Sequence, residues 1–342
     1  MEQRFGIITV TVIMSLLFSA EVFAFELDSI ASKNRVLGFG VSAYRWVDRV
    51  FNGTDTAYIS PTGYRWNVKL RANSWSDFNG FYFDGDHRMG MVSPSCVSIG
   101  ADVQYLAIAL GYDINVNRLA GGKDRSKSRF NFDFSSALVS GRLYSIRNED
   151  GMTIRYLGEN LDEPIRFSGV RTSTWGIDLI YYFNHRRYSN QAAFSFGRIQ
   201  KKSQGAFLTG VFFQSQKLFF DFGALPEEVR DWLPENWRRR NYHANGWNLG
   251  IGGGYGFNWV PRPNLTVGTL GIVIPSVNYG FLNSETRGCS FRMNYRMNAS
   301  VVWNRDRWFV GGVARADAGF IYSGSTLTNG LISFDAKIGW RF

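Results

Sequence analysis

Hydrophobic and polar residues alternate one by one along several stretches of this chain. In residues 64–73, aromatic and aliphatic residues take every even position, while Arg, Asn and Lys take every odd position. Residues 291–304 and 332–342 repeat the alternation, and Val302 is the apolar exception on the polar face. A period of two residues is typical of β-strands whose two faces meet different surroundings. The pattern therefore predicts antiparallel strands with one apolar and one polar face.

The length of these stretches separates a membrane barrel from a soluble β-sandwich, which alternates in the same way. A strand that spans a bilayer needs about 9–11 residues, whereas strands of globular proteins average about 5–6. Several stretches here run to about twelve residues or more, beyond that globular average. In residues 247–259, Trp247 and Trp259 bracket an apolar face, as interfacial aromatic residues do in membrane barrels. The lengths favour a membrane barrel, with a soluble exported β-sandwich that binds a ligand as an alternative.

Gly, Pro, Asn and Asp residues divide the chain after residue 62 into expected strands. These strands cover residues 64–75, 79–91, 97–114, 130–145, 152–158, 172–184, 206–222, 246–259, 264–275, 290–304, 307–322 and 331–342. We therefore expect an all-β fold, a transmembrane antiparallel up-and-down β-barrel of about 12 strands, within a range of about 10 to 14.

Such barrels have short periplasmic turns and longer external loops. Counting back from a periplasmic C-terminus places the turns at 261–264 and 304–307 in the periplasm. Residues 225–241 predict a short helical turn in an external loop. The segment 185–205 is a misfit, either a long periplasmic excursion or an irregular hairpin. The longer external connections are expected near residues 116–129, 224–244, which includes this helical turn, and 276–289.

The two ends of the chain carry targeting features. Residues 1–24 have the pattern of a signal peptide, with Arg4, an apolar core and a small residue at Ala24. We expect cleavage after Ala24, an N-terminal periplasmic or luminal segment over residues 25–62, and the barrel over residues 63–342. The last strand places Ile338, Trp340 and Phe342 on one face, the pattern that the outer-membrane assembly machinery reads. We therefore expect the protein in a bacterial outer membrane.

Charge indicates what the barrel meets. The chain is basic, with a net charge of +10, and an exported basic chain is expected to meet anionic lipids or solutes rather than nucleic acid. The polar strand faces predict an interior that is either closed by paired charges or open to anions. The charges expected to face the lumen are Arg65, Lys69, Arg71, Asp102, Asp133, Asp178, Arg292, Arg296, Arg315, Asp317, Asp335, Lys337 and Arg341.

Candidate chemistry is sparse. The three histidines have no metal-ligand spacing, so neither a metal site nor a cofactor is expected. A lipid hydrolase would need a serine activated by a base, and His185 with Ser189 or Ser195 is the candidate. The glycines of residues 250–256 leave room for a plug or for a solute passage. A disulfide between the two cysteines, Cys96 and Cys289, is permitted but not required.

Three segments carry a family resemblance: DTAYISPTGYRWNV, YYFNHRRYSNQAAFSFGRIQKKSQGAFLTG and NGWNLGIGGGYGFNWVP. They resemble domain-of-unknown-function family 4421, an uncharacterised family of predicted outer-membrane β-barrels from Bacteroidetes. The resemblance covers most of the mature chain and implies the barrel and its membrane, but no activity. Because His185 is not a required family position, the resemblance weakens the hydrolase hypothesis. It implies a signature formed by Asn184, Ser189, Gln200, Lys201, Lys202, Ser203 and Gly205.

The leading hypothesis is a non-enzymatic, porin-like outer-membrane barrel that stabilises the envelope, or passes or binds small solutes or anions at a basic lumen. A membrane enzyme that modifies lipid or lipopolysaccharide is the second hypothesis, and the soluble β-sandwich is the third. The expected partners are outer-membrane lipids and lipopolysaccharide, the barrel-assembly machinery and small anionic solutes.

Overall fold

The computed structural model describes residues 53–83, 87–105, 108–116, 127–238, 241–282, 286–323 and 325–342. Residues 54–342 form one compact unit. The predicted signal peptide and most of the predicted segment 25–62 lie outside the described residues. None of the helices in the described ranges is long and apolar enough to cross a membrane.

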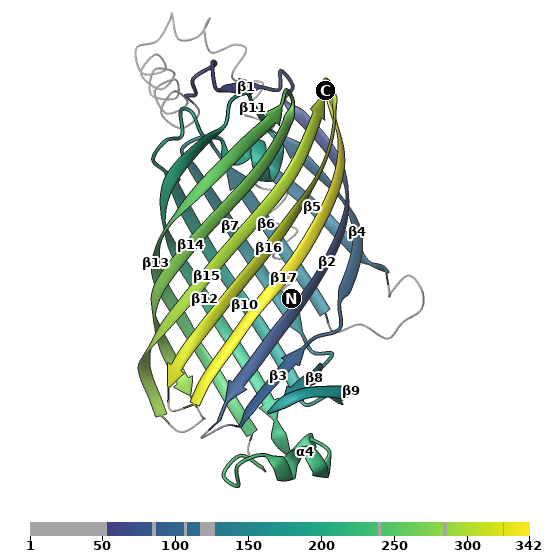
Figure 1. Ribbon diagram of the computed structural model, residues 1–342, viewed down its shortest axis with the longest axis vertical. Coiled ribbons are helices and arrows are strands. Elements are labelled where there is room, and N and C mark those ends of the chain that lie inside the picture. Colours follow the sequence, from purple (N-terminus) through teal and green to yellow (C-terminus); the bar gives the residue numbers. More distant parts are fainter. Residues whose placement is uncertain are drawn as a thin grey trace, which may run out of the picture. The chain divides into compact units, whose positions relative to one another are not determined.

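Twelve antiparallel strands of the described chain form a closed ring (Figure 1). The ring closes because β17 pairs with β2, from Thr326 opposite Tyr82 to Arg341 opposite Asn67. In order, the ring strands are β2 (Trp66–Tyr82), β4 (Cys96–Tyr105), β5 (Ile108–Asn115), β6 (Lys127–Ser135), β7 (Val139–Asn148), β10 (Val170–Tyr182), β12 (Gln204–Asp221), β13 (Asn241–Arg262), β14 (Leu265–Leu282), β15 (Thr286–Arg305), β16 (Trp308–Ser323) and β17 (Ser325–Arg341).

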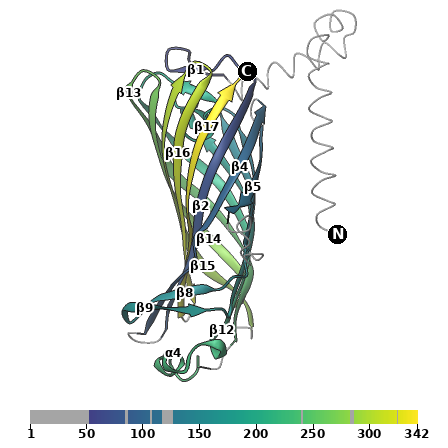
Figure 2. The same ribbon diagram turned by 90° about the vertical axis from the view of Figure 1, so that its right-hand side faces the viewer.

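The remaining elements lie at the two ends of the ring. At one end, β3 (Arg88–Val92), β8 (Met152–Leu157) and β9 (Glu159–Phe167) extend β2 as a small sheet. The same end carries η2 (Phe222–Ala224) and α4 (Glu227–Trp232), and we call it the α4 end (Figure 2). The opposite, C-terminal end carries β1 (Ile59–Pro61), paired with β11 (Arg198–Gln200), and η1 (Gln191–Ser195).

The predicted fold class is confirmed, but two compensating errors produced the predicted strand number. Segments 97–114 and 130–145, each expected as one strand, are both hairpins, β4–β5 and β6–β7. Segments 79–91 and 152–158, expected in the ring, contribute mainly to the small sheet. The predicted connection 276–289 is much shorter, because β14 and β15 pair from Leu282 opposite Thr286 onward. The predicted turn 304–307 and the helical turn in 225–241 are both present.

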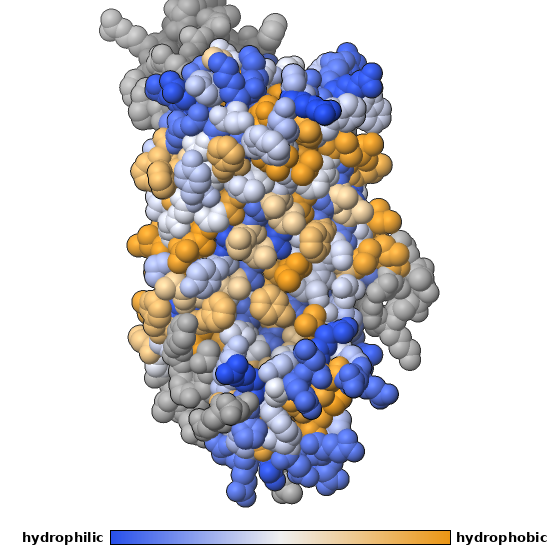
Figure 3. Space-filling model, in the orientation of Figure 1, coloured by the Kyte–Doolittle hydropathy of each residue, from blue (hydrophilic) through white to orange (hydrophobic). Residues whose placement is uncertain are grey.

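The alternation in sequence places apolar side chains outside and polar side chains inside. Leu70 on β2 is 61% exposed, whereas its neighbour Lys69 is 2% exposed. On β13 the exposed apolar face runs from Trp247 to Trp259, a rise of roughly 30 Å along the barrel axis at the usual strand tilt. That rise matches the hydrocarbon core of a bilayer. Figure 3 shows apolar residues across the middle of one face and polar residues towards both ends.

Candidate functional site in the barrel lumen

The connection between β10 and β12 folds back into the C-terminal end of the lumen. We call residues 184–203 the plug. Its residues Tyr188, Ala193 and Phe196 are fully buried in an apolar cluster with inward-facing residues of the wall. Phe196 adopts a left-handed backbone conformation, with φ of 61°, and its ring packs on Phe309 at 5.6 Å. That conformation costs a non-glycine residue roughly 1–2 kcal/mol, which the burial of the ring offsets.

Gln200 lies at the centre of the hydrogen bonds that hold the plug. Its amide oxygen accepts from the Ser189 backbone N–H at 3.0 Å and from the Asn258 side chain of β13 at 3.1 Å. Its amide nitrogen donates to the carbonyl oxygens of Arg187 and Lys202, at 2.7 and 3.0 Å. Gln200 and Asn258 are fully buried, so these bonds fix the plug to the wall in the absence of bulk water.

The other signature residues lie around the same junction. Asn184 donates to the Gly205 carbonyl at 3.0 Å, and Ser203 accepts from the Val260 N–H at 2.9 Å. Lys201 donates to the Thr56 carbonyl at 2.9 Å. The ammonium of Lys202 lies 5.2 Å from the Tyr58 ring. The signature implied by the resemblance therefore coincides with the attachment of the plug and of β1.

Two basic residues of the wall donate to plug carbonyls. Arg341 is fully buried and donates to the Phe196 carbonyl at 2.9 Å and to the Asn304 side chain at 2.6 Å. Lys69 donates to the Ser195 carbonyl at 3.0 Å and to the Gln104 side chain at 2.6 Å. Both residues were predicted as lumen-facing charges, and both contact the plug directly.

Glycines of the wall make room for the plug. A Cβ on Gly256 would overlap the Tyr188 hydroxyl, and a Cβ on Gly268 would overlap the Cβ of Ala193. A Cβ on Gly311 would lie 2.8 Å from the Phe196 ring. Of the two uses expected for the glycine run, a packed plug is the one that Gly256 serves.

We expect Gly256→Val to loosen the plug without unfolding the barrel. Overpacking typically costs about 1–3 kcal/mol, which corresponds to a rise of about 5-fold to 150-fold in local opening. Hydrogen–deuterium exchange of the plug backbone measures this rise. Gly253→Val, on the same strand as Gly256, is the matched control, because a Cβ added to Gly253 would have no atom within 4 Å other than those of its chain neighbours. Equal plug exchange in the two variants would show that Gly256 does not support the plug.

The α4 end is filled by a second apolar cluster, which we call the mouth cluster. Inward-facing residues near the ends of several ring strands pack there with residues of the small sheet and of the β12–β13 loop. The ring centroid of Phe81 on β2, for example, lies 4.8 Å from that of Phe220 and 5.4 Å from that of Phe222. Its other main members include Met89, Met152, Val170, Leu225, Val229, Leu233, Trp237, Tyr242, Ile321 and Leu327.

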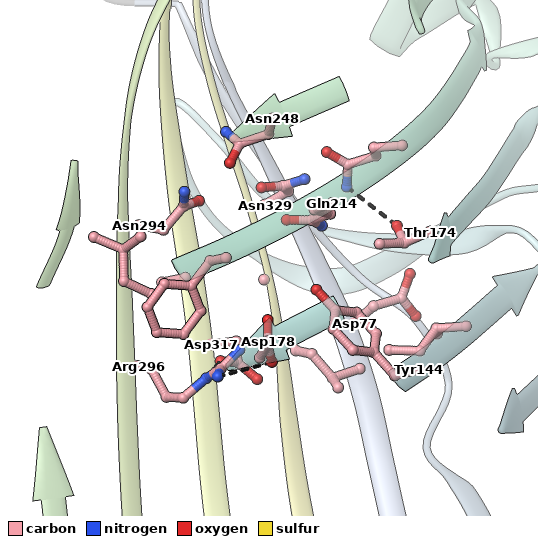
Figure 4. A pocket seen from close by; sticks show the side chains of 18 of the residues that line it. Asp77, Tyr144, Thr174, Asp178, Gln214, Asn248, Asn294, Arg296, Asp317 and Asn329 are labelled. Carbon is pink, nitrogen blue, oxygen red and sulfur yellow. Dashed lines mark hydrogen bonds and ion pairs between the residues drawn. The ribbon is translucent and has the colours of Figure 1, made fainter. Parts of the chain in front are cut away.

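A charged network crosses the middle of the lumen. Asp178 of β10 accepts from Arg142 of β7 at 2.8 Å and from Arg296 of β15 at 2.9 Å. Arg296 also pairs with Asp317 of β16 at 2.6 Å. Figure 4 shows Arg296, Asp178 and Asp317 converging from different strands. Because β10 and β15 are separated by three strands on the shorter way around the ring, the Asp178–Arg296 pair bridges the lumen.

The network lies between two cavities of about 120 and 130 Å³. Arg142, Asp178 and Arg296 line both cavities. The α4-side cavity is also lined by amides and hydroxyls such as Asn248 and Thr174. The C-terminal-side cavity reaches the plug at Phe194 and Ser195. Its charged lining comprises six basic residues, Lys69, Arg71, Arg142, Arg296, Arg315 and Lys337, and three acidic residues, Asp102, Asp133 and Asp178.

Most of the predicted lumen charges lie inside the ring. Arg71 pairs with Asp102 at 3.2 Å, and Asp335 accepts from Asn73 at 2.8 Å. Arg292 donates to the side chains of Gln216, Asn294 and Asn329. Arg65 departs from the prediction, because it precedes β2 and its side chain is exposed at the C-terminal rim.

The sequence analysis did not predict two of the charged residues that face the lumen, Arg142 and Asp113. Asp113 pairs with Arg71 at 2.7 Å. Both errors follow from the hairpins that were expected as single strands. In an unbroken strand, residues of opposite parity face opposite sides, so Asp102 and Asp113 cannot both point inward. Because the chain turns back between β4 and β5, Asp102 and Asp113 lie on the same, inward face. The chain also turns back between β6 and β7, so Asp133 and Arg142 lie opposite each other on the inward face.

The two serines of the hydrolase hypothesis form hydrogen bonds within the plug. Ser189 is buried, and its hydroxyl accepts from the Ala192 N–H at 3.1 Å. The Ser195 hydroxyl donates to the Gln191 carbonyl at 3.3 Å. Burial, with the nearby Arg186 charge, lowers the pKa of His185 from its ordinary value. Cys96 is buried and Cys289 is exposed, and no disulfide joins these two described residues.

The closed ring, its apolar belt and its polar lumen define an antiparallel transmembrane β-barrel. A family model described as "Domain of unknown function (DUF4421)" matches residues 53–342, so the chain belongs to this family. The comparison with curated proteins gives no match.

Solved structures with some likeness include other barrels. The translocator domain of autotransporter NalP from Neisseria meningitidis is 13% identical, with a TM-score of 0.34 over 92% of this chain and 98% of that domain. The toluene transporter TodX of P. putida is 9% identical, with a TM-score of 0.21 over 86% of this chain and 97% of that one. Because both TM-scores are low, the fold assignment rests on the strand pairing of this chain alone.

Proposed function

We propose that this protein is a non-enzymatic outer-membrane barrel, closed at rest, whose C-terminal-side cavity binds small anions. The observation that carries the proposal is a basic-lined cavity enclosed between the plug and the network around Asp178. Asp113 and Asp317, outside the lining, pair with Arg71 and Arg296, whereas Arg315 and Lys337 form no ion pair with another described residue. Arg315 and Lys337 are therefore the cations that favour an anionic occupant. Passage of the same anions would require the plug to move.

The outer surface supports the membrane location. The apolar belt ends in aromatic residues at both sides, such as Trp247 with Tyr279 at one end and Trp308 with Trp340 at the other. The C-terminal end carries short turns between β13 and β14 and between β15 and β16. The α4 end also has short turns, but it carries the long connections from β7 to β10 and from β12 to β13. Since longer loops are external in such barrels, we place the α4 end outside the cell. Outward-facing Ile338 and Phe342 fit recognition by the assembly machinery.

A cysteine in the loop that carries α4 tests the location and the orientation. Cys289 itself lies in register with Tyr279 and Trp247 at the lipid-facing belt edge, so it is changed to Ser. We expect a membrane-impermeant maleimide to label Glu235→Cys in intact cells, because Glu235 is exposed beyond the end of α4. Cys289→Ser alone should give no surface label, because Cys96 is buried. Labelling that requires cell lysis would contradict the orientation, and recovery of the protein away from the outer membrane would contradict the location.

A further inference from the structure

A row of polar residues crosses the outer surface near the α4 end. Strand register places Ser128, Arg147, Ser173, Lys217 and Asn245 side by side on β6, β7, β10, β12 and β13. Arg147 and Lys217 are exposed. They lie one strand to either side of Ser173, so their Cα atoms are roughly 10 Å apart. Five neighbouring strands thus present hydrogen-bond donors along one row of the strand register.

The next outward-facing row towards the C-terminal end is the aromatic edge of the belt. It consists of Phe130, Ser145, Trp175, Ser215 and Trp247 on the same five strands. The three aromatic residues are 41–48% exposed. Two residues along a strand span roughly 7 Å, so each polar residue lies beyond the belt edge of its own strand, on the headgroup side.

A third cation lies next to this row. Arg171 is exposed on β10, two residues from Ser173, and its guanidinium lies 5.9 Å from the Phe219 ring on β12. We call Arg147, Arg171 and Lys217 the outer basic cluster. They contrast with the lumen arginines, because none of the three forms an ion pair with another described residue.

Neither Asp221 nor Glu149, which lie close along β12 and β7, forms an ion pair with the outer basic cluster. Asp221, two residues beyond Phe219, accepts from the Gly223 N–H at 3.1 Å. Glu149 lies beyond the end of β7. Along the strands below the cluster, Ile177, Leu179 and Val211 are at least half exposed on the lipid-facing side. The surface therefore offers cations at headgroup height directly above an apolar wall.

We propose that the outer basic cluster binds the phosphate groups of lipid A, the phosphorylated glycolipid of the outer leaflet. Arginine and lysine donate charge-assisted hydrogen bonds to phosphate oxygens, and the planar arginine group does so in a bidentate manner. Ser128, Ser173 and Asn245 supply further donors on both sides. The acyl chains lie against the apolar wall beneath the cluster. The inference rests on the proposed outer-membrane location with the α4 end outside.

Native mass spectrometry of the folded full chain in detergent tests this site with purified lipid A. We expect Arg147→Gln, Arg171→Gln and Lys217→Gln together to weaken lipid A binding about tenfold or more. The matched control removes three exposed cations from the C-terminal end, Arg262→Gln, Arg305→Gln and Arg307→Gln, and should change binding by less than about twofold. Retention of heat-modifiable migration on gels confirms that both variants are folded.

Two outcomes would overturn the lipid A site. One is equal binding by the triple variant and the unmodified chain. The other is equal binding of dephosphorylated lipid A, or of phosphatidylglycerol, by the unmodified chain. A failure of the proposed orientation is recognised separately, because the Glu235→Cys thiol would then be protected in intact cells whatever the purified chain binds.

Discussion

Replacing Asp178 with alanine is expected to lower the free energy of unfolding by about 3–5 kcal/mol, the usual cost of removing one partner of a buried ion pair. Asp178 is 3% exposed and accepts from Arg142 and Arg296 at once. Without it, the two guanidinium groups share Asp317 alone, at 4.0 and 2.6 Å. Urea titration of the folded barrel, followed by tryptophan fluorescence, measures the change.

Asp150→Ala provides the control for Asp178→Ala. Asp150 pairs with Arg166 at 3.9 Å, and the Arg166 side chain is 72% exposed. Solvent screening limits such a pair to about 1 kcal/mol or less. If the two variants lose similar stability, the cross-lumen network is not a main support of the barrel.

Removing the plug is expected to open the C-terminal-side cavity to reagents from that end. Asn298 lines this cavity. A cysteine placed there by Asn298→Cys, with Cys96→Ser and Cys289→Ser, should react slowly while the plug is in place. Replacing residues 185–203 with a short Gly/Ser loop should raise the rate about a hundredfold or more, since plug opening should cost about 3 kcal/mol.

The charge of the reagent tests the nature of the cavity. A negatively charged thiosulfonate should react faster than a positively charged one in the plug-free variant, because basic residues outnumber acidic ones in the lining. Changing Lys69, Arg315 and Lys337 to Gln should remove this preference. Rapid labelling with the plug present would show that the plug does not seal the lumen, and a preference for the cationic reagent would contradict the anion site.

The sequence predicted the barrel because alternation is a local signal. On β2, for example, odd-numbered residues such as Lys69 face inward and even-numbered residues such as Leu70 face outward along the whole strand. The same alternation also limited the site prediction, since the reversals between β4 and β5 and between β6 and β7 were not recognised, and the expected directions of Asp113 and Arg142 were wrong. The plug has no strand period, and its contacts depend on distant residues such as Asn258. Its closely spaced aromatic residues, Tyr188, Phe194 and Phe196, were the available sign of a buried segment.

Single-channel recording of the unmodified, folded chain in a planar bilayer tests the closed lumen most directly. The plug, the network around Asp178 and the mouth cluster lie one after another along the same lumen, so we expect no steady conductance from protein shown to be inserted. Steady openings at low voltage would contradict a lumen closed at rest.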